Sequence, residues 1–149
     1  ITTGTRAPDF SLQDQNGDTH TIAQYKGKKI LLYFYPKDDT PGCTTEACSF
    51  RDNYEELQKA GLVVLGVSKD NVKSHKKFAD KYELPFPLLA DGDTEVCKAY
   101  GVWKLKKFMG REYMGVDRMS ILIDEEGKIA KVYEEVKPKE HVGEVKESL

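Results

Sequence analysis

The sequence predicts an α/β fold in which helices flank a mixed central sheet. Two observations carry this prediction. Apolar segments with the length and composition of buried strands alternate with amphipathic helical patterns over the first two thirds of the chain. The last third holds two strand-like segments joined by a short turn, and a final helix follows them. Strand–helix alternation favours parallel strands and a hairpin favours an antiparallel pair, so the sheet should be mixed.

The strand predictions rest on apolar runs bounded by turn residues. Residues 29–35 contain the run Ile-Leu-Leu-Tyr-Phe-Tyr, which is typical of a central strand buried on both faces. Gly127, between the last two strands, favours a hairpin turn. The other predicted strands cover residues 19–22, 62–68, 88–91, 120–124 and 129–133.

Helical patterns fill the gaps between these strands. One helix is predicted from Asp70, a good N-cap residue, to Tyr82, because its apolar residues fall on one stripe. That stripe consists of His75, Phe78, Ala79 and Tyr82. Shorter helices are predicted over residues 94–100 and 141–149. Together with the strands, they give the element order of a thioredoxin-like fold.

Length and composition exclude several classes of protein. The 149 residues fit a single domain over residues 1–149, and no repeat or linker divides them. The 23 basic and 25 acidic residues nearly balance, so we expect no binding to nucleic acid. No apolar run is long enough for a membrane span, and no signal-peptide pattern opens the sequence. Three cysteines do not make a disulfide framework here, which favours a cytoplasmic protein with reactive thiols.

Neither a metal ion nor an organic cofactor is expected. There is no Cys-x-x-Cys pair, and His20, His75 and His141 lack the spacing of metal ligands. We interpret each histidine as a surface or helix-terminus residue. Cys97 is interpreted as a core thiol, with a reserve role in disulfide formation as the alternative. The lysines at 104, 106 and 107 are interpreted as part of a solvated loop.

The segment after the central strand carries the strongest sign of chemistry. Residues 35–48 read Tyr-Pro-Lys-Asp-Asp-Thr-Pro-Gly-Cys-Thr-Thr-Glu-Ala-Cys. Thr40 suits the N-cap of a helix and Pro41 suits its first position, which places Cys43 in the first turn. Free N–H groups and the positive end of the helix dipole favour an anion there, so Cys43 should ionise readily.

The helical periodicity separates the two cysteines of this segment. Cys43 lies on the apolar stripe, whereas Cys48 lies about 140° away among polar residues and near solvent. Residues five apart in an ideal helix have Cα atoms roughly 8.7 Å apart. A disulfide needs about 4.4–6.8 Å. A bond between these two sulfurs would therefore require the first turns of the helix to unwind.

The same segment resembles a known family, the peroxiredoxins. Pro36, Thr40 and Cys43 match their Pro-x-x-x-Thr-x-x-Cys signature. The fuller string around it resembles the bacterioferritin comigratory protein, or peroxiredoxin Q, subfamily. The resemblance covers nearly the whole chain, including Ala-Pro-Asp-Phe-Ser-Leu at residues 7–12 and Gly-Val-Asp-Arg at residues 115–118.

The resemblance implies a thiol-dependent peroxidase that reduces hydrogen peroxide and organic hydroperoxides without a cofactor. Cys43 would attack the peroxide and become a sulfenic acid, which Cys48 would resolve as an intramolecular disulfide. Thr40 and Arg118 would bind the peroxide and stabilise the thiolate. Pro36 would shield Cys43 from water. The reductant would be thioredoxin or a similar dithiol protein, and the enzyme would be a monomer or weak dimer.

Two further readings of site residues accompany the resemblance. Glu46 would orient Arg118, with an ordinary place on the helix face as the alternative. The chain has Met-Ser-Ile after Arg118 where the family commonly has Ser-Thr-Phe, so Ser120 keeps a hydroxyl while the packing differs.

A separate interpretation concerns three apolar residues, Trp103, Phe108 and Met109. We interpret them as part of the core, with an apolar wall for organic peroxides as the alternative.

Two other functions on the same fold stay open. A thiol–disulfide oxidoreductase would resemble thioredoxin, with a Cys-x-x-Cys motif and a proline before a later strand. Here the cysteines are spaced Cys-x4-Cys, and no proline precedes the strand at residue 120. A non-enzymatic redox sensor would use the same oxidation but signal through a partner.

Overall fold

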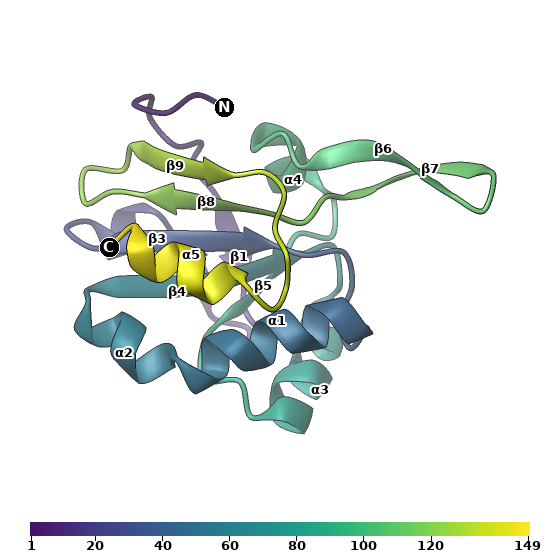
Figure 1. Cartoon of the computed structure of the whole chain (residues 1–149), viewed down its shortest axis with the longest axis horizontal. Helices are drawn as coiled ribbons and strands as arrows, with labels where there is room; N and C mark the ends of the chain where they lie inside the picture. Colours follow the sequence, from purple (N-terminus) through teal and green to yellow (C-terminus); the bar gives the residue numbers. More distant parts are fainter.

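A five-stranded mixed sheet forms the centre of the computed structural model, which describes residues 1–149 (Figure 1). Its strand order is β5-β4-β3-β8-β9. β4 runs parallel to β3 and β5, whereas β8 is antiparallel to β3 and β9. The predicted α/β fold with a mixed sheet is confirmed. The strands are β3 (Lys29–Phe34), β4 (Leu62–Ser68), β5 (Leu88–Ala90), β8 (Met119–Ile123) and β9 (Ile129–Tyr133).

The central strand β3 is buried because it has a neighbour on each edge and a cluster of apolar side chains on each face. Leu31 and Tyr33 point to one face, and Ile30, Leu32 and Phe34 point to the other. The first face is covered by α1 (Pro41–Asp52), α2 (Tyr54–Lys59), α3 (Val72–Tyr82) and α5 (His141–Glu147). The second face packs against α4 (Glu95–Ala99) and the N-terminal segment.

Small differences from the predicted elements have local causes. Asn71, not Asp70, caps α3, because its side chain accepts a hydrogen bond of 2.8 Å from the Ser74 N–H. The helix after Thr40 ends at Asp52, and α2 starts separately at Tyr54. The N-terminal segment also holds β1 (Ser11–Gln13), β2 (Thr19–Thr21) and the 3₁₀ turn η1 (Ala23–Tyr25), of which only β2 was predicted.

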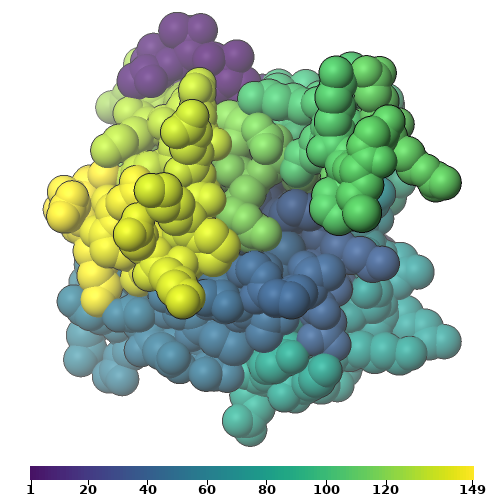
Figure 2. Space-filling model, turned by 45° about the vertical axis from the view of Figure 1, so that its right-hand side comes forward, coloured from purple at the N-terminus to yellow at the C-terminus, as the bar shows by residue number.

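A second hairpin projects from the body of the molecule, between α4 and β8 (Figures 1 and 2). It consists of β6 (Trp103–Phe108) and β7 (Arg111–Val116). The interpretation of Lys104, Lys106 and Lys107 as a loop was wrong, because all three lie in β6. Lys104 and Lys106 reach the Asp117 carboxylate at 3.4 and 3.9 Å, so this one negative charge offsets part of theirs.

The apolar residues of this hairpin do not pack as predicted. Phe108 and Met109 are 66% and 89% exposed, so their assignment to the core was wrong. Trp103, at the base of the hairpin, is half-buried against the second face of the sheet. No helix of the structure combines the length and the apolar character that crossing a membrane requires.

All three histidines are buried, so their prediction as surface residues was wrong, whereas His141 does begin α5 as a helix-terminus residue. Burial of an imidazole is tolerated when its nitrogens have hydrogen-bond partners. Each histidine has such a partner at 2.6 to 2.7 Å. The pairs are Asp14–His20, Asp38–His75 and Ser120–His141.

Candidate active site

The first turn of α1 presents Cys43 at the end of the central strand. Thr40 is extended, Pro41 is the first helical residue, and the Thr44 N–H donates the first helical bond to the Thr40 carbonyl at 2.8 Å. The N–H groups of Gly42 and Cys43 precede that bond and have no partner within the helix. The Thr40 side chain does not cap the helix; its Oγ1 donates instead to the Lys37 carbonyl at 2.9 Å.

Arg118 joins Cys43 and Glu46, two of the three predicted site residues that lie in α1. It lies just before β8, whose Met119 pairs with Phe34 at the end of β3, so the sheet brings it beside the start of α1. Its Nη2 donates to Cys43 Sγ at 3.4 Å, and its Nη1 donates to Glu46 Oε1 at 2.9 Å. Cys43 is 1% exposed and Glu46 is fully buried. Cys43, Glu46 and Arg118 therefore form one connected group.

Burial sets the electrostatics of this group. It raises the pKa of Glu46 to about 7, although the Arg118 charge and hydrogen bond oppose the rise. Glu46 Oε2 has no hydrogen-bond partner, which agrees with a carboxylate that is costly to ionise. Burial lowers the pKa of Arg118, but Cys43 and Glu46 more than offset this and leave that pKa raised. The guanidinium thus stays charged against the sulfur.

Gly42 leaves room for Arg118, a role that the sequence did not reveal. A Cβ atom at Gly42 would lie 3.0 Å from Arg118 Nη2 and 3.6 Å from Pro138 Cγ. A side chain there would press on the guanidinium that contacts Cys43. Beside this turn lies a cavity of about 400 Å³, lined by Pro41, Gly42, Thr45, Lys137, Pro138, Lys139 and Glu140.

The remaining predicted residues lie outside this connected group, at different depths in the molecule. Pro36 is half-buried and lines a separate cavity of about 220 Å³ with residues of the β6–β7 hairpin. Cys48 is half-buried in α1, one turn and a half beyond Cys43, and all three thiols are free. Cys97 is fully buried in the core, as predicted. Burial raises the pKa of its thiol far above the ordinary value, and the neighbouring Asp91 raises it further.

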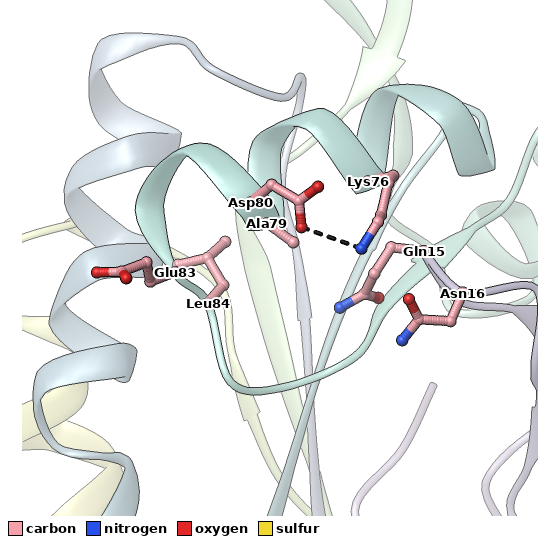
Figure 3. A pocket seen from close by; sticks show the side chains of 7 residues that line it. All are labelled: Gln15, Asn16, Lys76, Ala79, Asp80, Glu83 and Leu84. Carbon is pink, nitrogen blue, oxygen red and sulfur yellow. Dashed lines mark ion pairs between the residues drawn. The ribbon is translucent and has the colours of Figure 1, made fainter.

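A larger hollow lies away from these thiols, between the end of β1 and α3 (Figure 3). Its volume is about 590 Å³. Gln15 uses its amide to bond the Phe86 carbonyl and the Leu88 N–H, and Lys76 pairs with Asp80 at 3.1 Å. Gln15 and Lys76 are thus already engaged in structural contacts, so we place the candidate active site at Cys43 and not in this hollow.

Comparison with known proteins agrees with this location. Residues 3–132 match the AhpC/TSA family. A putative peroxiredoxin bcp of Coxiella burnetii is 54% identical over 145 residues, which are 97% of this chain and 96% of the relative. Peroxiredoxin Bcp of Bacillus subtilis is 50% identical over 149 residues, which are 100% of this chain and 95% of the relative.

Solved structures give the same answer at the level of the fold. A bacterioferritin comigratory protein of Xanthomonas campestris superposes with a TM-score of 0.91 at 36% identity, over 99% of this chain and 96% of that one. A Xylella fastidiosa PrxQ mutant superposes with a TM-score of 0.93 at 33% identity, over 99% and 94%. The chain therefore belongs to the AhpC/TSA family of thiol peroxidases, in the Bcp or peroxiredoxin Q group of the peroxiredoxins.

Proposed function

We propose that this chain reduces hydrogen peroxide and organic hydroperoxides through a sulfenic acid at Cys43. Cys48 resolves that acid as an intramolecular disulfide, and thioredoxin or a similar dithiol protein reduces the disulfide. The observation that carries the proposal is the placement of Arg118 against both Cys43 Sγ and the buried Glu46. A cation fixed beside a thiol at a helix N-terminus is the arrangement that nucleophilic sulfur chemistry needs.

In the first step, the Cys43 thiolate attacks one peroxide oxygen. The S–O bond forms as the O–O bond breaks, so the sulfur is oxidised by two electrons and the leaving oxygen departs as water or an alcohol after taking a proton. Negative charge moves from the sulfur to the leaving oxygen. Arg118, the Thr40 hydroxyl and the free N–H groups of the first turn can hold both oxygens in line. Half-buried Pro36 limits access of water from its side.

In the second step, Cys48 attacks the sulfenic sulfur, and an S–S bond replaces the S–O bond as water leaves. Both cysteines lie in the continuous helix α1. In an ideal helix their Cα atoms are roughly 8.7 Å apart, beyond the reach of a disulfide. The first turns of α1 must therefore unwind before resolution. A dithiol partner then exchanges with the disulfide and restores both thiols.

The wider features of the proposal have separate support. The Xanthomonas campestris relative is described as having alkyl peroxide reduction activity, which supports organic hydroperoxides as substrates here. Recycling by a dithiol protein needs a reducing compartment, so the cytoplasm is the proposed location. The 23 basic and 25 acidic residues give no electrostatic basis for nucleic-acid binding, and the thiol chemistry proposed here uses no cofactor. A monomer or weak dimer is the proposed state.

The test is peroxide consumption with a thioredoxin system. The wild type should turn over repeatedly, and Cys43→Ser should consume no peroxide above background. Cys97→Ser is the matched control, because it removes a buried thiol outside the group, and it should keep full turnover. An enzyme that reduces insulin disulfides but leaves peroxide untouched would instead be a thiol–disulfide oxidoreductase. Oxidation of Cys43 that stops after a single turnover would favour a sensor.

A further inference from the structure

The loop between β3 and α1 is fastened to α3 by a buried polar cluster. The Asp38 side chain makes three hydrogen bonds there, and its residue is 8% exposed. Its partners are Tyr35 OH at 2.6 Å, Ser74 Oγ at 2.8 Å and His75 Nδ1 at 2.7 Å. We call Tyr35, Asp38, Ser74 and His75 the Asp38 cluster.

The hydrogen bonds of His75 fix the orientation of its imidazole ring within this cluster. Its Nε2 lies 2.9 Å from the Leu89 carbonyl, which can only accept, so Nε2 carries a hydrogen. His75 is fully buried and both its ring nitrogens are satisfied, so the ring has one orientation in which to hold the loop.

The backbone of the loop is held as well. The Asp38 N–H donates to Asp70 Oδ2 at 2.9 Å, and Ser68 Oγ donates to the same oxygen at 2.8 Å. Thr40 Oγ1 reaches back to the Lys37 carbonyl at 2.9 Å, across the same Asp38. Asp38, midway between Pro36 and Thr40, is therefore the residue at which both the backbone and the side chain of the loop are held.

We propose that Asp38 and His75 are positioning residues for peroxide reduction, because they fix the loop over residues 36–40 that leads directly into the first turn of α1 and Cys43. This inference rests on the proposed peroxidase function. Neither residue contacts the Cys43 sulfur; both act through the loop. A displacement of about 1 Å at a reacting centre can cost 10²-fold in rate. Loosening the loop at Asp38 should therefore slow the attack of Cys43 on peroxide.

The structure offers a matched control for a merely stabilising role. Asp14 and His20 form another buried carboxylate–imidazole pair, with Nε2 and Oδ2 2.6 Å apart. The other His20 nitrogen lies 2.6 Å from Tyr25 OH, and Asp14 accepts from the backbone of residues 16 and 18. These contacts stay within the N-terminal segment. Loss of this pair should lower stability without touching the loop.

The experiment measures the second-order rate constant for Cys43 oxidation by hydrogen peroxide in a single turnover, beside the thermal midpoint of each variant. Asp38→Ala should lose roughly 10- to 100-fold in rate. Asp14→Ala should stay within twofold of the wild type despite a lower midpoint. Asp38→Asn should stay within about threefold, because the amide can donate to His75 Nδ1 while its oxygen accepts from Tyr35 OH.

The outcomes separate the inference from the function on which it rests. Folded Asp38→Ala that reacts at the wild-type rate overturns the inference, and so does an equal loss in Asp14→Ala. If Asp38→Ala does not fold, Ser74→Ala removes a single donor from half-buried Ser74 and should lose two- to fivefold; a wild-type rate there also overturns it. A wild type that does not react with peroxide would instead contradict the proposed function.

Discussion

Gly42 offers a test of how closely Arg118 must lie against Cys43. Gly42→Ala lowers the backbone entropy cost of forming the first turn of α1 by about 0.5–1 kcal/mol, and the contact of the new Cβ with Arg118 opposes that gain. The new Cβ would lie 3.0 Å from Arg118 Nη2, which is tighter than ordinary contact. Arg118 is held by Glu46 at 2.9 Å and by Cys43 at 3.4 Å, so it can yield only by moving away from one of them.

The size of the loss follows from the shift that is needed. Relief of the contact requires a displacement of a few tenths of an ångström. If about 1 Å costs 10²-fold, then about 0.3–0.5 Å costs roughly four- to tenfold in the rate of Cys43 oxidation. The measurement is rapid-quench mass spectrometry of Cys43 after mixing with peroxide, with thermal unfolding recorded in parallel.

Gly143→Ala is the control for this prediction. Gly143 lies in α5, and a Cβ there would meet nothing within 4 Å. It should gain stability and keep the wild-type rate. Gly42→Ala that oxidises as fast as Gly143→Ala would refute the view that the contact between Arg118 and Cys43 limits the chemistry.

Three further predictions concern resolution and pH. Cys48→Ser should form the sulfenic acid at the wild-type rate but fail to turn over with thioredoxin; normal turnover would point to Cys97. Burial raises the Glu46 pKa to about 7, so the folded state holds that proton more tightly than the unfolded chain does. The stability from this group is therefore present below about pH 4.5 and lost as pH rises to about 7, by up to about 3 kcal/mol. Glu46→Gln should lack this loss in urea unfolding at pH 5 and pH 8, and a parallel pH dependence in both proteins would contradict it. Burial, with a smaller contribution from Arg118, lowers the His141 pKa to about 4. The free energy of unfolding of the wild type should therefore fall as pH drops from about 6.5 to about 4, again by up to about 3 kcal/mol. His141→Gln should lose less stability over this pH range. An equal loss in both proteins would show that His141 is not the titrating group.

The sheet could be predicted because its strands are apolar on both faces. The run at residues 30–35 needs no tertiary information to be recognised as buried, and its partners at β4 and β8 are equally apolar. The β6–β7 hairpin could not be predicted in this way. Beyond Trp103 and Val116 at its base, its side chains are largely exposed, so its charged sequence resembles that of a loop. What makes it a hairpin is backbone pairing, which leaves little trace in hydrophobicity.

The residues that the structure brings together at this candidate site were named from the sequence, whereas the residues that support them were not. The spacing around Cys43 identified the helix start, and family resemblance pointed to Arg118, which the sheet brings to 3.4 Å from the sulfur. The contacts of Gly42 and of the Asp38 cluster were not predictable. His75 is 37 residues from Asp38 along the chain, so only the folded structure shows that they meet. A histidine in isolation carries no sign of whether such a partner exists.

Arg118→Ala removes the cation that lies 3.4 Å from the reacting sulfur. The measurement is the rate constant for sulfenic acid formation at Cys43, made in a Cys48→Ser background so that resolution cannot hide the product. Removal of one donor to a developing charge typically costs about 10²–10³ in rate, and a loss of that size is expected here. A rate within a few-fold of the parent protein, from a variant that remains folded, would contradict the account.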